Sequence, residues 1–195
     1  MNNHLLGSDD FIPVLKKGLS VVGGSGAAAG IEICYTTTQN GQDAGISTEN
    51  ANRVIAEKFG ASASVIGIDT TTVSMKLFAP TSSGSEYVYL GIWDSSGNNR
   101  AISSGIATDT LNSSVPTTVT ASISSVTIET GDCLGYTNGS PKWSTSEVKA
   151  RMNDTDSPNP GDPYDGSDSG RVVFYQGSST GSVHEERDMV FCINS

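Results

Sequence analysis

A dense group of carboxylates lies in the C-terminal third of the chain. Five of the 13 aspartates fall between residues 154 and 168, a stretch that also holds Pro158, Pro160 and Pro163. Crowded oxygen ligands suit Ca²⁺, which takes about six to eight oxygens and accepts backbone carbonyls. The spacing departs from an EF-hand loop, because the twelfth position lacks a glutamate and the prolines intervene. A calcium site and a solvated acidic loop are therefore two open interpretations of Asp154, Asp156, Asp162, Asp165 and Asp168.

Three aromatic residues, Tyr87, Tyr89 and Trp93, are separated from one another by even numbers of positions. In a β-strand such residues share one face, because side chains alternate between the two faces. Each aromatic ring can bury on the order of 150–250 Å², so a stripe of them left in water is unusual. Three interpretations stay open: packing within the domain against a loop or the N-terminal arm, a subunit interface, and stacking on carbohydrate.

Catalytic signatures are missing from the sequence. The chain has two histidines, His4 and His184, and no Gly-x-Ser-x-Gly elbow. It also lacks the Glu-x-Asp-x-x-Glu strand pattern that places paired carboxylates in jelly-roll glucanases. The Glu185-Glu186-Arg187-Asp188 run is interpreted as a charged turn before the last strand. We therefore expect a non-enzymatic protein.

The net charge narrows the range of partners. With 21 acidic and 11 basic residues, the charge near −10 repels nucleic acid and anionic lipid. No run of about 20 apolar residues predicts a membrane span, and no secretory signal is recognised at the start. Three widely spaced cysteines argue against a dense disulfide framework and against a zinc site, and a bridge between Cys34 and Cys192 stays open.

Short alternating segments predict the fold class. Val73, Met75 and Leu77 form one apolar face, and Val88, Leu90 and Ile92 form another after a turn at residues 80–84. Ser and Thr number 48 and Gly 22, a composition that favours short strands and tight turns. The expected strands cover residues 31–37, 53–59, 71–79, 87–93, 101–107, 115–123, 126–129, 133–137, 148–152, 171–175 and 189–193. The prediction is an all-β protein with one antiparallel jelly-roll sandwich over residues 30–195.

Residues 1–29 are expected to form an extended N-terminal arm. Phe11 and Ile12 supply a short apolar patch, and the glycine-rich residues 23–30 have the composition of a linker. We expect Phe11 and Ile12 to contact either a neighbouring subunit or the arm's own domain.

Six segments of the chain carry a resemblance to a known group of domains. They are VIAEKF (54–59), TVSMKL (72–77), GIWDSSG (91–97), VTIETGDCLGY (126–136), RMND (151–154) and PYDG (163–166). Together, over residues 52–193, they resemble jelly-roll domains of virion and surface proteins of archaea and phages. The resemblance implies a non-enzymatic building block or attachment module. The leading hypothesis is a virion structural protein, in the capsid, its decoration or the tail, that assembles with itself and with other virion proteins. The alternative is an extracellular carbohydrate-binding or adhesion module, and a hydrolase on the same scaffold is third.

Overall fold

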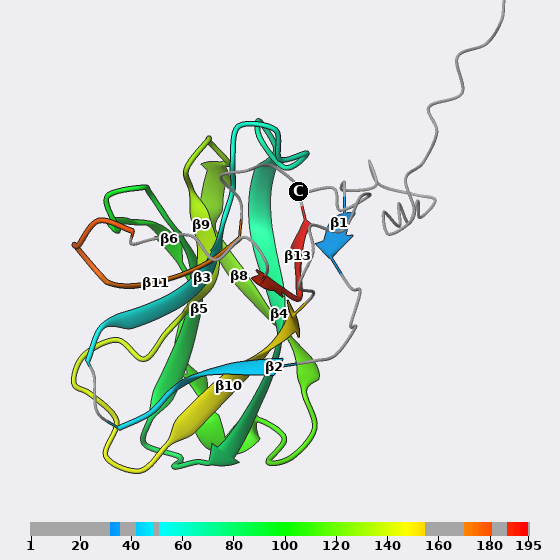
Figure 1. The fold of residues 1–195 in the computed structure, drawn as a ribbon. Helices are drawn as coiled ribbons and strands as arrows, with labels where there is room; N and C mark the ends of the chain where they lie inside the picture. Colours follow the sequence, from blue (N-terminus) through cyan, green and yellow to red (C-terminus); the bar gives the residue numbers. More distant parts are fainter. Residues whose placement is uncertain (1–31, 36–41, 49–50, 155–169, 181–186, 195) are drawn as a thin grey trace, which may run out of the picture.

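The computed structural model describes residues 32–35, 42–48, 51–154, 170–180 and 187–194. These residues form two antiparallel sheets packed face to face (Figure 1). The seven-stranded sheet contains β1 (Glu32–Tyr35), β2 (Gln42–Ile46), β4 (Asp69–Thr81), β8 (Thr117–Thr127), β10 (Glu147–Asp154), β12 (Arg187–Met189) and β13 (Phe191–Asn194). The six-stranded sheet contains β3 (Arg53–Lys58), β5 (Tyr87–Trp93), β6 (Asn99–Ile102), β7 (Ile106–Ala107), β9 (Cys133–Thr137) and β11 (Gly170–Tyr175). One 3₁₀ turn, η1 (Thr108–Thr110), follows β7.

The core lies between the sheets and is built by alternation. Val73, Met75 and Leu77 of β4 are at most 1% exposed, and so are Val88, Leu90 and Ile92 of β5. All six belong to one apolar cluster that joins both sheets. Because neighbouring side chains point to opposite faces, this inward set fixes which residues of β4 and β5 face outward. The predicted all-β antiparallel sandwich is confirmed.

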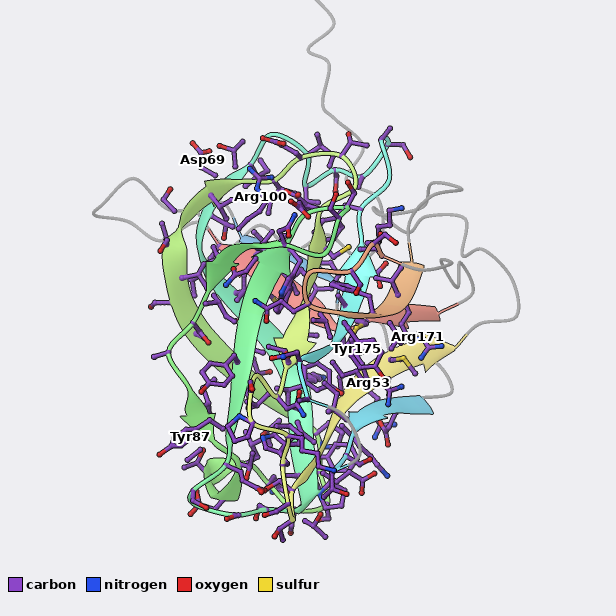
Figure 2. All side chains as sticks on the ribbon, turned by 90° about the vertical axis from the view of Figure 1, so that its left-hand side faces the viewer. Arg53, Asp69, Tyr87, Arg100, Arg171 and Tyr175 are labelled. Carbon is purple, nitrogen blue, oxygen red and sulfur yellow. The ribbon has the colours of Figure 1, made fainter. Side chains whose placement is uncertain are left out.

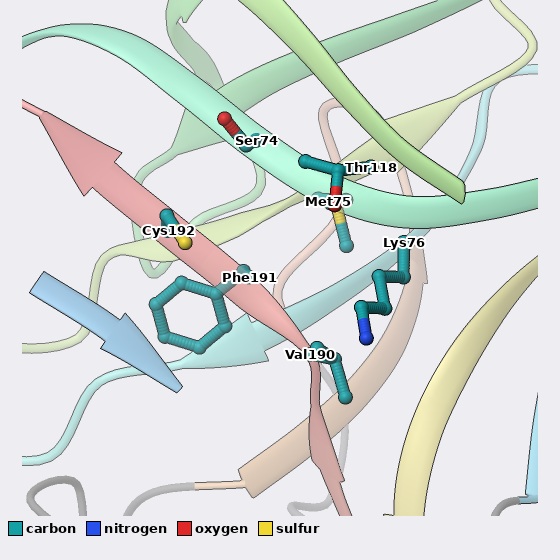
Figure 3. A pocket seen from close by; sticks show the side chains of 7 residues that line it. All are labelled: Ser74, Met75, Lys76, Thr118, Val190, Phe191 and Cys192. Atoms are coloured by element: carbon teal, nitrogen blue, oxygen red, sulfur yellow. The ribbon is translucent and has the colours of Figure 1, made fainter. Parts of the chain in front are cut away.

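Strand β4 is the centre of the seven-stranded sheet. It pairs with β8 along one edge, and along the other with β13 near Met75 and with β10 near Leu77. The chain passes between β4 and β10 at Val190, whose N–H donates to the Arg151 carbonyl and whose carbonyl accepts from the Lys76 N–H. A hollow of about 30 Å³ opens beside this crossing, next to Phe191 and Cys192 (Figure 3). That volume holds about one water molecule, so it is not a ligand site.

The predicted strands differ from the structure at four places. The last strand, expected over residues 189–193, is divided into β12 and β13, and Arg187 and Asp188 lie in β12 and not in the expected charged turn. Strand β2 was not expected, and it exists by pairing with β10 from Ile46 opposite Val148 to Gln42 opposite Met152. The two runs expected over residues 115–129 are one strand, β8, with a register shift opposite Thr70 to Thr72. The run expected over residues 101–107 divides into the end of β6 and the whole of β7. From β8 to β12 successive strands alternate between the sheets, so each connection crosses the sandwich.

Two further sequence predictions concern the N-terminal arm and membranes. The arm, with Phe11 and Ile12, lies outside the described residues. In the part of the chain that the structure describes, no helix has the length and apolar character needed to cross a membrane.

The cysteines fall into two chemical states. Cys192 on β13 is disulfide-bonded, while Cys133 on β9 is a free thiol with no solvent exposure. Burial raises the pKa of the Cys133 thiol far above its ordinary value, with smaller contributions from nearby carboxylates, so this thiol is unreactive. The backbone register of β1 and β13 places Cys34 directly opposite Cys192.

We expect one thiol per chain when the unreduced protein is unfolded in denaturant and titrated with a thiol reagent. Cys192→Ser should destabilise the protein by about 2–5 kcal/mol, because the cross-link no longer restricts the unfolded chain. Prior reduction should lower the melting temperature of the unmodified protein and leave that of Cys192→Ser unchanged. Three titratable thiols in the unreduced protein would contradict the bonded state of Cys192.

Candidate binding site on the outer face of the six-stranded sheet

The three aromatic residues of β5 have different environments. Tyr87 is 42% exposed, Tyr89 is half-buried and Trp93 is completely buried. Figure 2 shows Tyr87 near one end of this sheet, well separated from the exposed Tyr175 of β11. Tyr87 and Tyr89 are therefore available for contacts. The prediction that Trp93 is a binding or interface residue is corrected, because its ring packs within the domain.

Trp93 is covered by parts of the chain that are distant in sequence. It belongs to a small second apolar cluster with Val54, Ala56, Cys133, Val172 and Phe174. The Phe174 ring meets it edge-on, with ring centroids 6.4 Å apart. The loops that follow β5 and β11 are joined to each other, since Gly177 N–H donates to the Gly97 carbonyl and Thr180 N–H donates to the Ser95 carbonyl. Packing within the domain therefore holds for this ring, but its partners lie on strands β3, β9 and β11 and not on a loop or the arm.

A pocket of about 330 Å³ lies next to the two tyrosines. This volume is at the lower end of the range for small-molecule sites. Two segments form it: the start of β5 with the turn before it, and the loop between β9 and β10. The lining residues are Ser85, Glu86, Tyr87, Tyr89, Asn138, Ser140, Pro141, Lys142, Trp143 and Ser144.

Glycines hold both tyrosine rings close to the backbone. A Cβ at Gly139 would lie 3.1 Å from Cε2 of Tyr89, and the φ of +64° at Gly139 also favours glycine. A Cβ at Gly105 would lie 3.0–3.1 Å from Cβ and ring atoms of Tyr87. Each ring thus packs against a bare stretch of main chain, which limits its motion.

Trp143 anchors the β9–β10 loop. Its side chain is 2% exposed and belongs to the main core cluster, so the loop inserts a large ring between the sheets. Its indole N–H donates to the Tyr87 carbonyl at 3.0 Å, which ties the loop to the start of β5. The two sides of the pocket are therefore joined by one buried side chain.

Glu86 makes the second connection between the same segments. Its Oε1 accepts hydrogen bonds from Ser144 N–H, from Ser144 Oγ at 2.8 Å and from Thr145 N–H at 3.2 Å. Its Oε2 accepts from Ser146 N–H at 2.7 Å. Burial by itself raises the pKa of Glu86, but hydrogen bonds from Ser146 and Ser144 outweigh it and lower the pKa from 4.5 to about 2. Glu86 is thus ionised at neutral pH and holds the loop in place.

The chemistry of the pocket suits binding better than bond cleavage. Among its described lining residues Glu86 is the one carboxylate, and its two oxygens already accept hydrogen bonds from residues 144–146. Glycoside hydrolysis normally requires two carboxyl groups about 5–10 Å apart. Glu57 is a buried carboxylate, but it accepts a hydrogen bond from Met189 N–H and does not line the pocket. The pocket does present hydroxyl groups and the exposed Lys142 around two aromatic rings.

The acidic loop is largely outside the described part of the chain. Asp154 ends β10 in the backbone, while Asp156, Asp162, Asp165 and Asp168 lie in the range 155–169 that the structure does not describe. Within the described ranges no three His, Cys, Asp or Glu side chains gather into a metal site. The calcium site stays a prediction.

Sequence reasoning found two residues of this pocket and missed the rest. The alternation of β5 identified Tyr87 and Tyr89. Trp143 and Glu86 escaped it because both lie at loop positions with no periodic pattern. A large aromatic between Pro141 and three hydroxyl residues was the one available signal, since a tryptophan seldom stays in a polar loop unless it is buried.

Comparison of the chain with models of protein families, with curated proteins and with solved structures found no match.

We expect Glu86→Gln to destabilise the protein by about 1–3 kcal/mol at pH 7, because an amide replaces a charged acceptor of several hydrogen bonds. A carboxyl with a lowered pKa stabilises the fold above its ordinary value of 4.5, and this contribution is lost as the pH falls to about 2. The difference in unfolding free energy between the unmodified protein and Glu86→Gln, measured by denaturant titration, should therefore decrease as the pH falls over that interval. Glu147→Gln, which removes one surface ion pair with Lys149, is the matched control and should change stability little. A difference independent of pH would contradict the role of Glu86.

Proposed function

We propose that this protein is a non-enzymatic recognition module that binds a neutral glycan in the pocket beside Tyr87 and Tyr89. The observation that carries the proposal is a pair of tyrosine rings on one strand face, each packed on a glycine and bordered by hydrogen-bonding side chains. Sugar rings present a flat C–H face and a rim of hydroxyl groups. Fixed aromatic rings can stack on the C–H face, and serine, amide and ammonium groups can form hydrogen bonds with the hydroxyl groups.

The rigidity of the pocket supports binding. The Glu86 hydrogen bonds and the Trp143 anchor hold the β9–β10 loop in one position before a ligand arrives. A site that is already ordered loses less conformational entropy on binding. The net charge near −10 disfavours strongly anionic glycans, which is why a neutral one is proposed.

A virion structural protein is the second candidate. The resemblance of residues 52–193 to jelly-roll domains of archaeal and phage proteins favours it, and so does an uncharged strand at the edge of the seven-stranded sheet. Both functions fit the same fold, because the glycan pocket and that edge lie on different sheets. A particle component that also attaches to a surface glycan would combine them.

Removal of either tyrosine ring should weaken glycan binding without unfolding the protein. Tyr87→Ala and Tyr89→Ala are each expected to lower affinity by about 2- to 12-fold, the loss of one aromatic contact. A glycan array would identify the ligand, and titration calorimetry with that glycan would measure the change.

Tyr175→Ala is the matched control, because Tyr175 is 47% exposed and lies outside the pocket. It should leave binding unchanged. Retention of no neutral glycan by the folded protein, or equal losses from all three variants, would overturn the proposed function.

A further inference from the structure

We propose that β8 is a docking strand that pairs antiparallel with β8 of a second copy of this chain and so joins two seven-stranded sheets. This inference does not depend on the glycan site. It would supply the subunit contact that a virion component needs.

Strand β8 is paired along one edge in the described part of the chain. Its partner is β4, from Leu77 opposite Thr117 to Asp69 opposite Thr127. The described backbone hydrogen bonds join β8 to no other strand. Figure 2 shows β8 at one margin of the ribbon, running down from Asp69. Strand β6 of the other sheet lies close to β8 but is not hydrogen-bonded to it, so the outer edge of β8 keeps backbone N–H and C=O groups that another strand can pair with.

The composition of β8 is unusual for an edge strand. Residues 110–128 contain no charged side chain, although the whole chain carries 21 acidic and 11 basic residues. Proteins commonly protect edge strands with lysine, proline or a bulge, because an open edge recruits other chains. Here Pro116 precedes the strand and the register shift lies opposite Thr70 to Thr72, beyond Ser122. Residues 117–122 between them pair regularly with β4, and β-branched threonines at 117, 118 and 120 favour an extended strand.

A second copy of the same strand fits this edge better than a charged partner does. A two-fold axis at Thr120 places Thr120 opposite itself and Thr118 opposite Ser122. The side chains of all three are solvent-exposed, whereas Val119 and Ala121 point toward the core. Hydroxyl side chains opposite one another form favourable cross-strand pairs. Two molecules that each carry a charge near −10 repel, and an uncharged strand gives them a place to meet with little local repulsion.

The test is the solution mass of the full chain and of charge variants, measured by sedimentation equilibrium across a concentration series. The unmodified protein should dimerise reversibly. Thr118→Lys combined with Ser122→Lys places two like-charged pairs across the axis and should weaken the dimer by about 2- to 30-fold. Thr118→Glu combined with Ser122→Glu should do the same, and an equimolar mixture of the two double variants should restore association as a heterodimer.

Gln176→Lys combined with Ser179→Lys adds the same charge at exposed positions away from β8 and should leave the dimer unchanged. Circular dichroism checks that each variant is folded, and the glutamate pair tests the proposal if the lysine pair unfolds. A strictly monomeric unmodified protein would overturn the proposal. A dimer whose affinity is unchanged in both β8 double variants would also overturn it, since another surface would then form the dimer. A mixture of the two double variants that fails to associate would overturn it as well, since another surface or another partner would then be involved.

Discussion

The apolar faces of β4 and β5 pack against each other across the sandwich, and the position of every other feature depends on that contact. Val73, Met75 and Leu77 on one sheet and Val88, Leu90 and Ile92 on the other are withdrawn from water in one cluster. A shift of one residue in the register of either strand would turn its apolar side chains toward water. The protein would then lose the free energy of burying several apolar side chains. The same constraint places Tyr87 and Tyr89 on the outer face, where Tyr87 is exposed and Tyr89 is half-buried.

The candidate site is formed where a loop is attached to this fixed strand. Trp143 contributes apolar burial and one hydrogen bond to the Tyr87 carbonyl, and Glu86 contributes a charged acceptor for several donors of the loop. Both contacts connect the loop to the start of β5. The pocket therefore keeps its shape through two different kinds of interaction, hydrophobic and electrostatic, which respond differently to pH and to salt.

The parts of the fold that could be predicted from sequence are those with a local pattern. The alternation of apolar residues in β4 and β5 predicted the core residues of these strands, the inward and outward faces of each strand, and two residues of the pocket. Strand β2 was missed because Gln42–Ile46 contains glycine and aspartate and becomes extended through its pairing with β10. The burial of Trp93 could not be inferred, since its partners lie on β3, β9 and β11, strands that meet only in three dimensions. Trp143 and Glu86 were missed for the same reason.

The most direct test of the central contact compares the unfolding free energies of Leu90→Ala and Tyr87→Ala by denaturant titration under one set of conditions. Leu90 is fully buried between the sheets, and Tyr87, three residues away on the same strand, is 42% exposed on the other face. We predict that Leu90→Ala costs about 2–5 kcal/mol and that Tyr87→Ala costs less than about 1 kcal/mol. Equal costs, or a larger cost at Tyr87, would contradict the assignment of the inner and outer faces of β5.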